Sequence, residues 1–157
     1  MAALPEPGSK APAFSGETQD GTTVSLKEFL GKPVVLFFYP KDDTPGCTTE
    51  ACSFRDEYAA LKGAGAAVLG ISPDSAKSHA KFAEKHALPY PLVADPEKKI
   101  VQAYGVWGEK SLYGRKYMGV ARTTFVIDAK GRIAHVFERV KPLGHAREVV
   151  AAVRGLE

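Results

Sequence analysis

The chain has 157 residues, of which 45% are hydrophobic and 25% are charged. These fractions are ordinary for a globular protein, so we expect a single domain over residues 1–157 whose core needs no metal or disulfide. Basic and acidic residues number 21 and 18, and no run of Lys and Arg is longer than a pair, which argues against a nucleic-acid partner.

The cellular location is predicted from segments that the sequence lacks. Residues 1–10 have neither a basic start nor an apolar stretch, and no segment approaches the roughly 18 apolar residues of a membrane span. We therefore expect a cytoplasmic protein without a membrane partner. In that reducing compartment, cysteines such as Cys47 and Cys52 are more often catalytic or redox-sensing than structural.

The first part of the chain predicts a hairpin, a short helix and a buried strand. Residues 13–15 and 22–24 flank a turn-rich stretch, as in an N-terminal β-hairpin. Ser25 and Glu28 have the spacing of a capping box and start a short helix. The unbroken apolar run Val34–Phe38 is typical of a strand that is buried on both faces.

The rest of the chain alternates strands and helices. After a helix that follows the first buried strand, we expect a strand over 67–72, a helix over 74–87, a short strand over 91–94 and a helix from Asp95 to about Tyr104. An irregular segment follows over 105–119. The chain should end with an antiparallel pair of strands over 123–128 and 132–138 and a closing helix over 145–153. A strand–helix–strand unit implies parallel pairing. The order predicts an α/β, thioredoxin-like fold, with a central mixed β-sheet flanked by helices.

The segment after the buried strand contains both cysteines. Thr44 can N-cap a helix, Pro45 suits its first position, and the apolar spacing continues to Gly63. Cys47 then lies in the first helical turn, where the free N–H groups and the positive end of the helix favour a thiolate over a thiol. The sequence therefore predicts a nucleophilic sulfur at Cys47.

The second cysteine, Cys52, follows five residues later. On a regular helix this spacing separates the two Cα atoms by about 8.7 Å, whereas a disulfide needs less than about 7 Å. The two sulfurs therefore cannot pair while the helix is intact. A reactive thiolate with a second thiol just out of reach suits a cysteine that peroxide oxidises to sulfenic acid, before a local opening brings in the other thiol.

Three blocks of the sequence resemble a known family. The pattern Pro-x-x-x-Thr-x-x-Cys that ends at Cys47 looks like the active-site signature of the peroxiredoxins. The longer string Thr-Pro-Gly-Cys-Thr-x-Glu-x-Cys over residues 44–52 resembles their bacterioferritin comigratory protein or peroxiredoxin Q group. Residues 70–74 and 122–128 are also similar to that group, so the resemblance covers nearly the whole chain.

The resemblance implies a thiol-dependent peroxidase that acts in antioxidant defence on hydrogen peroxide and small organic hydroperoxides. Cys47 would be the peroxidatic cysteine and Cys52 the resolving cysteine, which would form an intramolecular disulfide. Thioredoxin or a similar dithiol would recycle the enzyme. The family needs no metal or organic cofactor, and members of this group are often monomers.

The resemblance also implies which residues surround the sulfur. Thr44, Arg122 and the backbone N–H groups of Gly46 and Cys47 would hold the peroxide, and Pro40 would shield the thiolate from solvent. Without the resemblance, Thr44 is explained as an N-cap and Pro40 as the end of a strand. Arg122 would then be a solvated residue at a strand edge.

Other side chains give weaker signals. His79 and His86 lie seven residues apart on one predicted helix and pair with no cysteine, carboxylate or histidine at metal-ligand spacing, so we expect core or solvated histidines. Trp107, Tyr113 and Tyr117 fit either an entrance for peroxide or a cap on the core, and the sequence does not decide between them.

Two alternative functions remain open at this point. A metal chaperone could use Cys47 and Cys52 with a histidine such as His135. A general thiol–disulfide reductase is disfavoured because the two cysteines do not form the Cys-x-x-Cys motif that suits rapid disulfide exchange.

Overall fold

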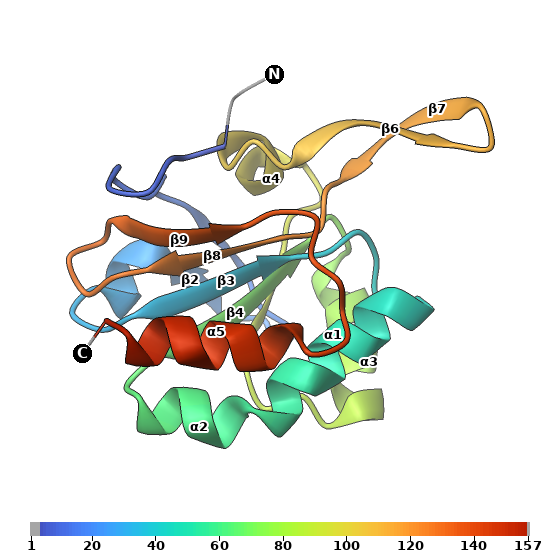
Figure 1. Ribbon diagram of the computed structural model, residues 1–157. Coiled ribbons are helices and arrows are strands. Elements are labelled where there is room, and N and C mark those ends of the chain that lie inside the picture. The colour runs from blue at the N-terminus through green and yellow to red at the C-terminus, as the bar shows by residue number, and fades with distance from the viewer. Residues whose placement is uncertain (1–3, 157) are drawn as a thin grey trace.

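The computed structural model describes residues 4–156, and its central element is a five-stranded sheet with helices on both faces (Figure 1). The strands follow the order β5 (Leu92–Ala94), β4 (Ala67–Ser72), β3 (Val34–Phe38), β8 (Thr123–Ile127) and β9 (Ile133–Phe137). Strand β4 pairs in parallel with β3 and β5, whereas β8 is antiparallel to both β3 and β9. The predicted mixed, thioredoxin-like sheet is therefore confirmed.

Strand β3 divides the hydrophobic core into two clusters because its alternate side chains point to opposite faces. Val35 and Phe37 belong to one cluster, and Leu36 and Phe38 belong to the other. All are fully buried, which explains the unbroken apolar sequence. The first cluster lies under the helices α1 (Pro45–Asp56), α2 (Tyr58–Gly63), α3 (Ala76–His86) and α5 (His145–Arg154), and the second lies under α4 (Lys99–Ala103).

The N-terminal hairpin is confirmed, with slightly shifted bounds, as β1 (Ser15–Glu17) and β2 (Thr23–Ser25). The short helix that follows is a 3₁₀ helix, η1 (Leu26–Phe29). The Glu28 carboxylate accepts the backbone N–H of Ser25, as the predicted capping box requires.

Two predicted helices have different bounds. The helix expected from Thr44 to Gly63 divides at Glu57, whose φ of −96° and ψ of 3° leave the helical region. The bend keeps Phe54 in α1 and Leu61 in α2 in the same core cluster. The helix expected from Asp95 begins only at Lys99, because Lys98 has a left-handed backbone with φ of 62°. The Asp95 carboxylate accepts the N–H groups of Lys99 and Val101 in its first turn.

The segment 105–119 is not irregular, as the sequence led us to expect. Most of it forms an antiparallel hairpin of β6 (Trp107–Leu112) and β7 (Arg115–Val120), which projects from the body of the protein in Figure 1. Tyr113 and Gly114 make the two-residue turn with positive φ angles, as tight hairpins require. The sequence hides these strands because both faces are largely solvent-exposed, so no alternation of apolar and polar residues marks them.

Candidate active site

The loop after β3 delivers Cys47 to the start of α1. Cys47 is the third residue of that helix and only 1% of it is exposed. N–H groups in a first helical turn have no partner within the helix, so they and the helix dipole can stabilise a thiolate there. Cys52 lies on the same uninterrupted helix and is partly exposed, and both cysteines are free.

Thr44 occupies the N-cap position, but its hydroxyl does not cap the helix as the sequence predicts. The hydroxyl instead donates to the carbonyl of Lys41 at 2.9 Å, and the Thr44 carbonyl accepts the first helical hydrogen bond from Thr48. The side chain therefore closes the loop that precedes the helix, as hydroxyl side chains often do by bonding a nearby backbone carbonyl.

Arg122 follows β7 and lies against the start of α1. Its Nη2 atom would be 3.1 Å from a Cβ atom at Gly46, so the glycine permits this close approach. Burial lowers the pKa of the guanidinium, but the charges of Cys47 and Glu50 more than offset this effect and raise it above its ordinary value. The structure thus brings Arg122 beside Cys47, and the side chain is not the solvated edge residue that burial habits alone suggest.

Glu50 is a site residue that the sequence did not point to. Its side chain is fully buried, and its Oε1 accepts Arg122 Nη1 at 3.0 Å. Its Oε2 is buried with no hydrogen-bond partner among residues 4–156. Burial raises the pKa of Glu50 to about 7, although Arg122 opposes the shift. The spacing of three residues from Cys47 could have revealed it, because such residues share one face of a helix.

The site therefore holds one guanidinium between two groups that can each carry a negative charge. In a buried setting, a cation beside a thiol favours the thiolate. The same cation can stabilise charge on an oxygen that leaves during a reaction. Cys47 and Arg122 are thus placed for nucleophilic chemistry on a small, polar substrate.

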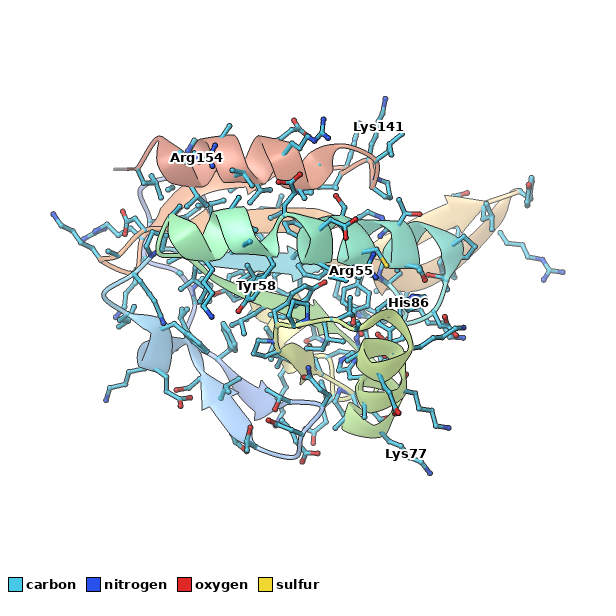
Figure 2. The ribbon with its side chains drawn as sticks, turned by 90° about the horizontal axis from the view of Figure 1, so that it is seen from below. Arg55, Tyr58, Lys77, His86, Lys141 and Arg154 are labelled. Carbon is cyan, nitrogen blue, oxygen red and sulfur yellow. The ribbon has the colours of Figure 1, made fainter. Side chains whose placement is uncertain are left out.

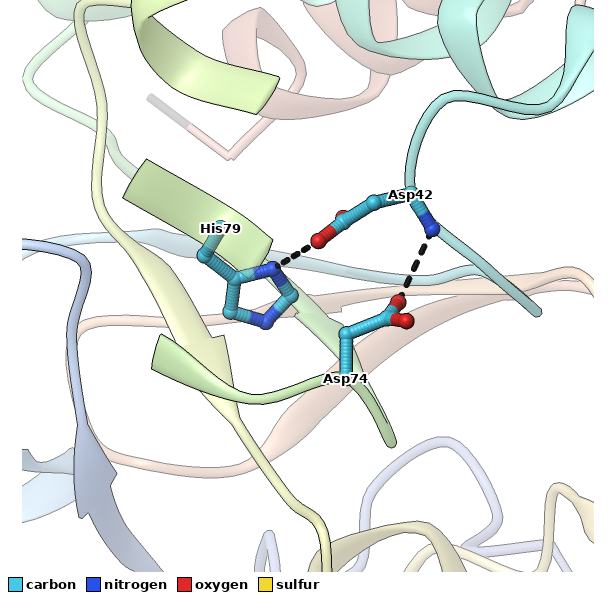
Figure 3. A group of neighbouring side chains, drawn as sticks. All are labelled: Asp42, Asp74 and His79. Atoms are coloured by element: carbon cyan, nitrogen blue, oxygen red, sulfur yellow. Dashed lines mark hydrogen bonds and ion pairs between the residues drawn. The ribbon is translucent and has the colours of Figure 1, made fainter. Parts of the chain in front are cut away.

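A second buried cluster fixes the loop between β3 and α1. The carboxylate of Asp42 accepts hydrogen bonds from Tyr39 (2.6 Å) and Ser78 (2.7 Å) and lies 2.7 Å from Nδ1 of His79. The backbone N–H of Asp42 donates to Asp74 at 2.8 Å (Figure 3). The loop that carries Pro40 and Thr44 is therefore tied to β4 and α3. Pro40 itself is half-buried.

Asp42, Asp74 and His79 have ligand atoms within 4.8 Å of one another, which raises the question of a metal. Both ring nitrogens of His79 face acceptors, since Nε2 lies 3.1 Å from the carbonyl of Val93. Nδ1 faces the Asp42 carboxylate at 2.7 Å, so both ring nitrogens already have hydrogen-bond partners within the protein. We therefore assign this cluster to positioning the loop. Neither cysteine belongs to a metal-ligand group within the described residues.

The histidines and aromatic residues singled out in the sequence lie in different surroundings. His79 is a core histidine, as expected, but it does pair with a carboxylate, which sequence spacing could not show because Asp42 is 37 residues away. Tyr113 is 97% exposed at the tip of the hairpin, and Tyr117 is also exposed. Trp107 packs partly buried against the second core cluster.

Helix α1 is held at its C-terminal end by a contact that would resist unwinding, and a groove lies along its outer face. Near its end, Arg55 donates to the carbonyl of His86 at 2.8 Å, which ties α1 to α3 (Figure 2). A groove of about 530 Å³ runs between α1 and the start of α5, and Cys52, Leu143 and Arg147 are among the residues that line it. Cys52 is thus reachable from outside.

Comparison with known proteins agrees with this geometry. The AhpC/TSA family matches residues 7–136. The chain is 50% identical over 145 residues to a putative peroxiredoxin bcp from Coxiella burnetii, covering 92% of this chain and 96% of that protein. It is 44% identical over 151 residues to peroxiredoxin Bcp from Bacillus subtilis, covering 96% of both.

Solved structures show the same relationship. A bacterioferritin comigratory protein from Xanthomonas campestris, described for its alkyl peroxide reduction activity, superimposes with a TM-score of 0.89 at 36% identity over 96% of this chain and 98% of that one. A PrxQ from Xylella fastidiosa has a TM-score of 0.92 at 32% identity, covering 98% of both chains. The matched family, the identities of these relatives and the shared fold all lead to one conclusion: the chain belongs to the AhpC/TSA family, among the Bcp-type peroxiredoxins.

Proposed function

We propose that this peroxiredoxin reduces hydrogen peroxide and small organic hydroperoxides through Cys47, with Cys52 as the resolving cysteine. The Cys47 thiolate attacks the terminal oxygen of the peroxide, the O–O bond breaks, and the sulfur becomes sulfenic acid. The other oxygen leaves as hydroxide or alkoxide and takes up a proton to give water or an alcohol. The observation that carries the proposal is the buried Cys47 at a helix N-terminus beside Arg122.

The residues around the sulfur have separate roles in this step. Arg122 stabilises the thiolate and the charge that develops on the leaving oxygen. The backbone N–H groups of Gly46 and Cys47 and the hydroxyl of Thr44 hold the peroxide, with the hydroxyl free to turn from its acceptor in the loop. Pro40 excludes water from the thiolate.

The second step needs a change in α1. Cys52 attacks the sulfenic sulfur, water leaves, and an intramolecular disulfide forms. Because both residues lie on one continuous helix, at least the first turns of α1 must unwind before the sulfurs meet. An external dithiol, thioredoxin or a similar protein, then reduces the disulfide by thiol–disulfide exchange. The groove beside Cys52 would give that dithiol access.

Steady-state turnover of hydrogen peroxide with thioredoxin and its reductase tests these assignments. We expect Cys47→Ser to reduce turnover to background. Cys52→Ser should consume one equivalent of peroxide per chain and then lose turnover with thioredoxin. Turnover that survives in Cys47→Ser would overturn the assignment of the nucleophile.

We also propose a cytoplasmic, monomeric enzyme. Two free cysteines suit a reducing compartment, and no helix within residues 4–156 is long and apolar enough to cross a membrane. Cell fractionation and light scattering of the reduced protein test the two statements, and a dimeric mass or recovery outside the cytosol would contradict them.

A further inference from the structure

The β6–β7 hairpin carries one charged side chain that behaves unlike its neighbours. Arg115, Lys116 and Glu109 are exposed, and the last two form a surface ion pair at 3.5 Å. Lys110 is partly buried instead, and its ammonium donates to the carbonyl of Val120 at 3.0 Å. A lysine side chain usually keeps its ammonium in water, so this position requires an explanation.

Gly119 on β7 leaves room for the Lys110 side chain to reach Val120. A Cβ atom at Gly119 would lie 2.9 Å from Cδ of Lys110 and 3.3 Å from Tyr117. The φ angle of Gly119 is not in the left-handed region, so its backbone conformation does not demand glycine. Glycine is needed at this position because the Lys110 side chain approaches so closely. The side chain thus runs from the middle of β6 across β7 toward the base of the hairpin.

The base of the hairpin leads directly into the active site. Val120, the acceptor of Lys110, precedes Arg122 by two residues. Burial lowers the pKa of Lys110, the charge of Arg122 lowers it further, and the charge of Cys47 opposes both. The hydrogen bond to Val120 thus holds the Lys110 ammonium two residues from the point where Arg122 leaves the backbone, and the charges of Arg122 and Cys47 act on it.

The charges of Arg122, Cys47 and Glu50 indicate what the lysine does. Arg122 is shared between Cys47 and Glu50, so a single positive charge faces two groups that can be anionic. Two cations held side by side are unfavourable unless an anion lies between them. A thiolate at Cys47 would provide that anion.

We propose that Lys110 is a positioning residue of the peroxidase site. As a second cation, it keeps Arg122 in place beside Cys47 and favours the thiolate form of Cys47. It does not contact the peroxide. The inference rests on the proposed role of Cys47, and it adds a residue from a hairpin outside the signature that ends at Cys47. Within residues 4–156, the charged groups of this cluster come from three elements: Arg122 from the segment before β8, its partner Glu50 from α1, and Lys110 from β6.

The test titrates the Cys47 thiol in a Cys52→Ser background, where it is the one remaining thiol, by the ultraviolet absorbance of the thiolate. We expect Lys110→Met to raise the thiol pKa, because a neighbouring cation favours the thiolate. The rate of reaction with hydrogen peroxide just below the thiol pKa should fall about threefold to tenfold. Lys110→Arg should restore most of both values, and Lys116→Met, a matched exposed lysine, should change neither.

A second variant tests the geometry without removing the charge. Gly119→Ala should displace the Lys110 side chain and shift the thiol pKa in the same direction as Lys110→Met. Because Lys110→Ala removes the atom that clashes, Gly119→Ala should have little further effect on the thiol pKa in that background.

The outcomes separate this inference from the proposed function. An unchanged thiol pKa in Lys110→Met, or a change in melting temperature alone, would overturn the inference and leave Cys47 as the nucleophile. A Cys52→Ser protein whose thiol titrates but does not react with peroxide would instead overturn the proposed function, while the thiol pKa would still test Lys110.

Discussion

Two buried clusters of ionisable side chains flank the segment that runs from β3 into α1, and they differ in how completely they are hydrogen-bonded. Around Asp42, five donors meet the carboxylates of Asp42 and Asp74, and both nitrogens of His79 face acceptors. Around Cys47, Glu50 leaves one oxygen without a partner among the described residues, and Arg122 is shared between two groups.

This difference in hydrogen bonding distinguishes the Asp42 cluster, which anchors the loop, from the Cys47 cluster, which is the reactive site. A buried network with every partner in place is rigid, because moving any member leaves a polar group unpaired. A buried site with incomplete pairing holds groups whose charge can change, and such groups are typical of catalysis. The anchor at Asp42 fixes the loop, and the loop then fixes Thr44 and the start of α1. The two clusters should therefore respond differently to mutation.

The largest expected effect is on the stability of the anchor. His79→Ala removes one of the three side-chain partners of the buried Asp42 carboxylate and the partner of the Val93 carbonyl, and each buried group left short of a partner costs about 1–3 kcal/mol. Urea unfolding measures the loss. His135→Ala, an exposed histidine on β9, is the matched control and should stay within about 0.5 kcal/mol. A cost for His79→Ala as small as that of the control would remove the distinction between the clusters.

The reactive site should lose rate instead. We expect Arg122→Met to lower kcat/KM for hydrogen peroxide by about 10²–10³, as for other groups that stabilise developing charge. Arg122→Lys keeps the charge but loses the planar fork of donors, so it should recover only part of the rate. Arg115→Met, an exposed arginine on the hairpin, is the control. Nearly full activity in Arg122→Met would contradict the account.

Glu50 should make stability depend on pH. Its pKa is raised from 4.5 to about 7 in the folded state, so between these values the folded protein binds more protons than the unfolded chain. Its contribution is complete below pH 4.5 and is lost as pH rises through 7, a change of about 3 kcal/mol. Glu50→Gln should flatten this part of the curve of unfolding free energy against pH. Glu84→Gln, an exposed carboxylate on α3, should not, and an unaltered slope in Glu50→Gln would show that another group titrates.

The smallest expected effect on stability is at Thr44. Thr44→Val removes one hydrogen bond to Lys41, which is worth about 1 kcal/mol, and it leaves the helix unaffected because no side-chain cap is lost. Thr44→Ser should preserve that bond. A larger loss of stability, together with a loss of helical signal in circular dichroism, would mean that the hydroxyl does cap α1.

The sequence predicts best what depends on neighbours in the chain. Val34–Phe38 and Ala67–Ser72 are predicted with the observed bounds, because a strand buried on both faces is uniformly apolar. The first-turn position of Cys47 follows from Thr44 and Pro45. The β6–β7 hairpin is missed because its surface is exposed and carries no hydrophobic period.

Long-range pairs leave no signal in local sequence patterns. Asp42 and His79 are 37 residues apart, and Glu50 and Arg122 are 72 apart, so neither pair has a local signal. Only the family resemblance placed Arg122 near the sulfur. The raised pKa of Glu50 depends on burial, which the sequence of α1 alone does not reveal.

The most direct test of the central claim is the intact mass and free-thiol count of the reduced protein before and after one equivalent of hydrogen peroxide, for the wild type beside Cys52→Ser. The account predicts that the wild type loses two hydrogens and both thiols as a monomer, and that Cys52→Ser gains a single oxygen. A wild type that gains oxygen or forms linked dimers would contradict the role of Cys52. A protein that does not react would contradict the role of Cys47.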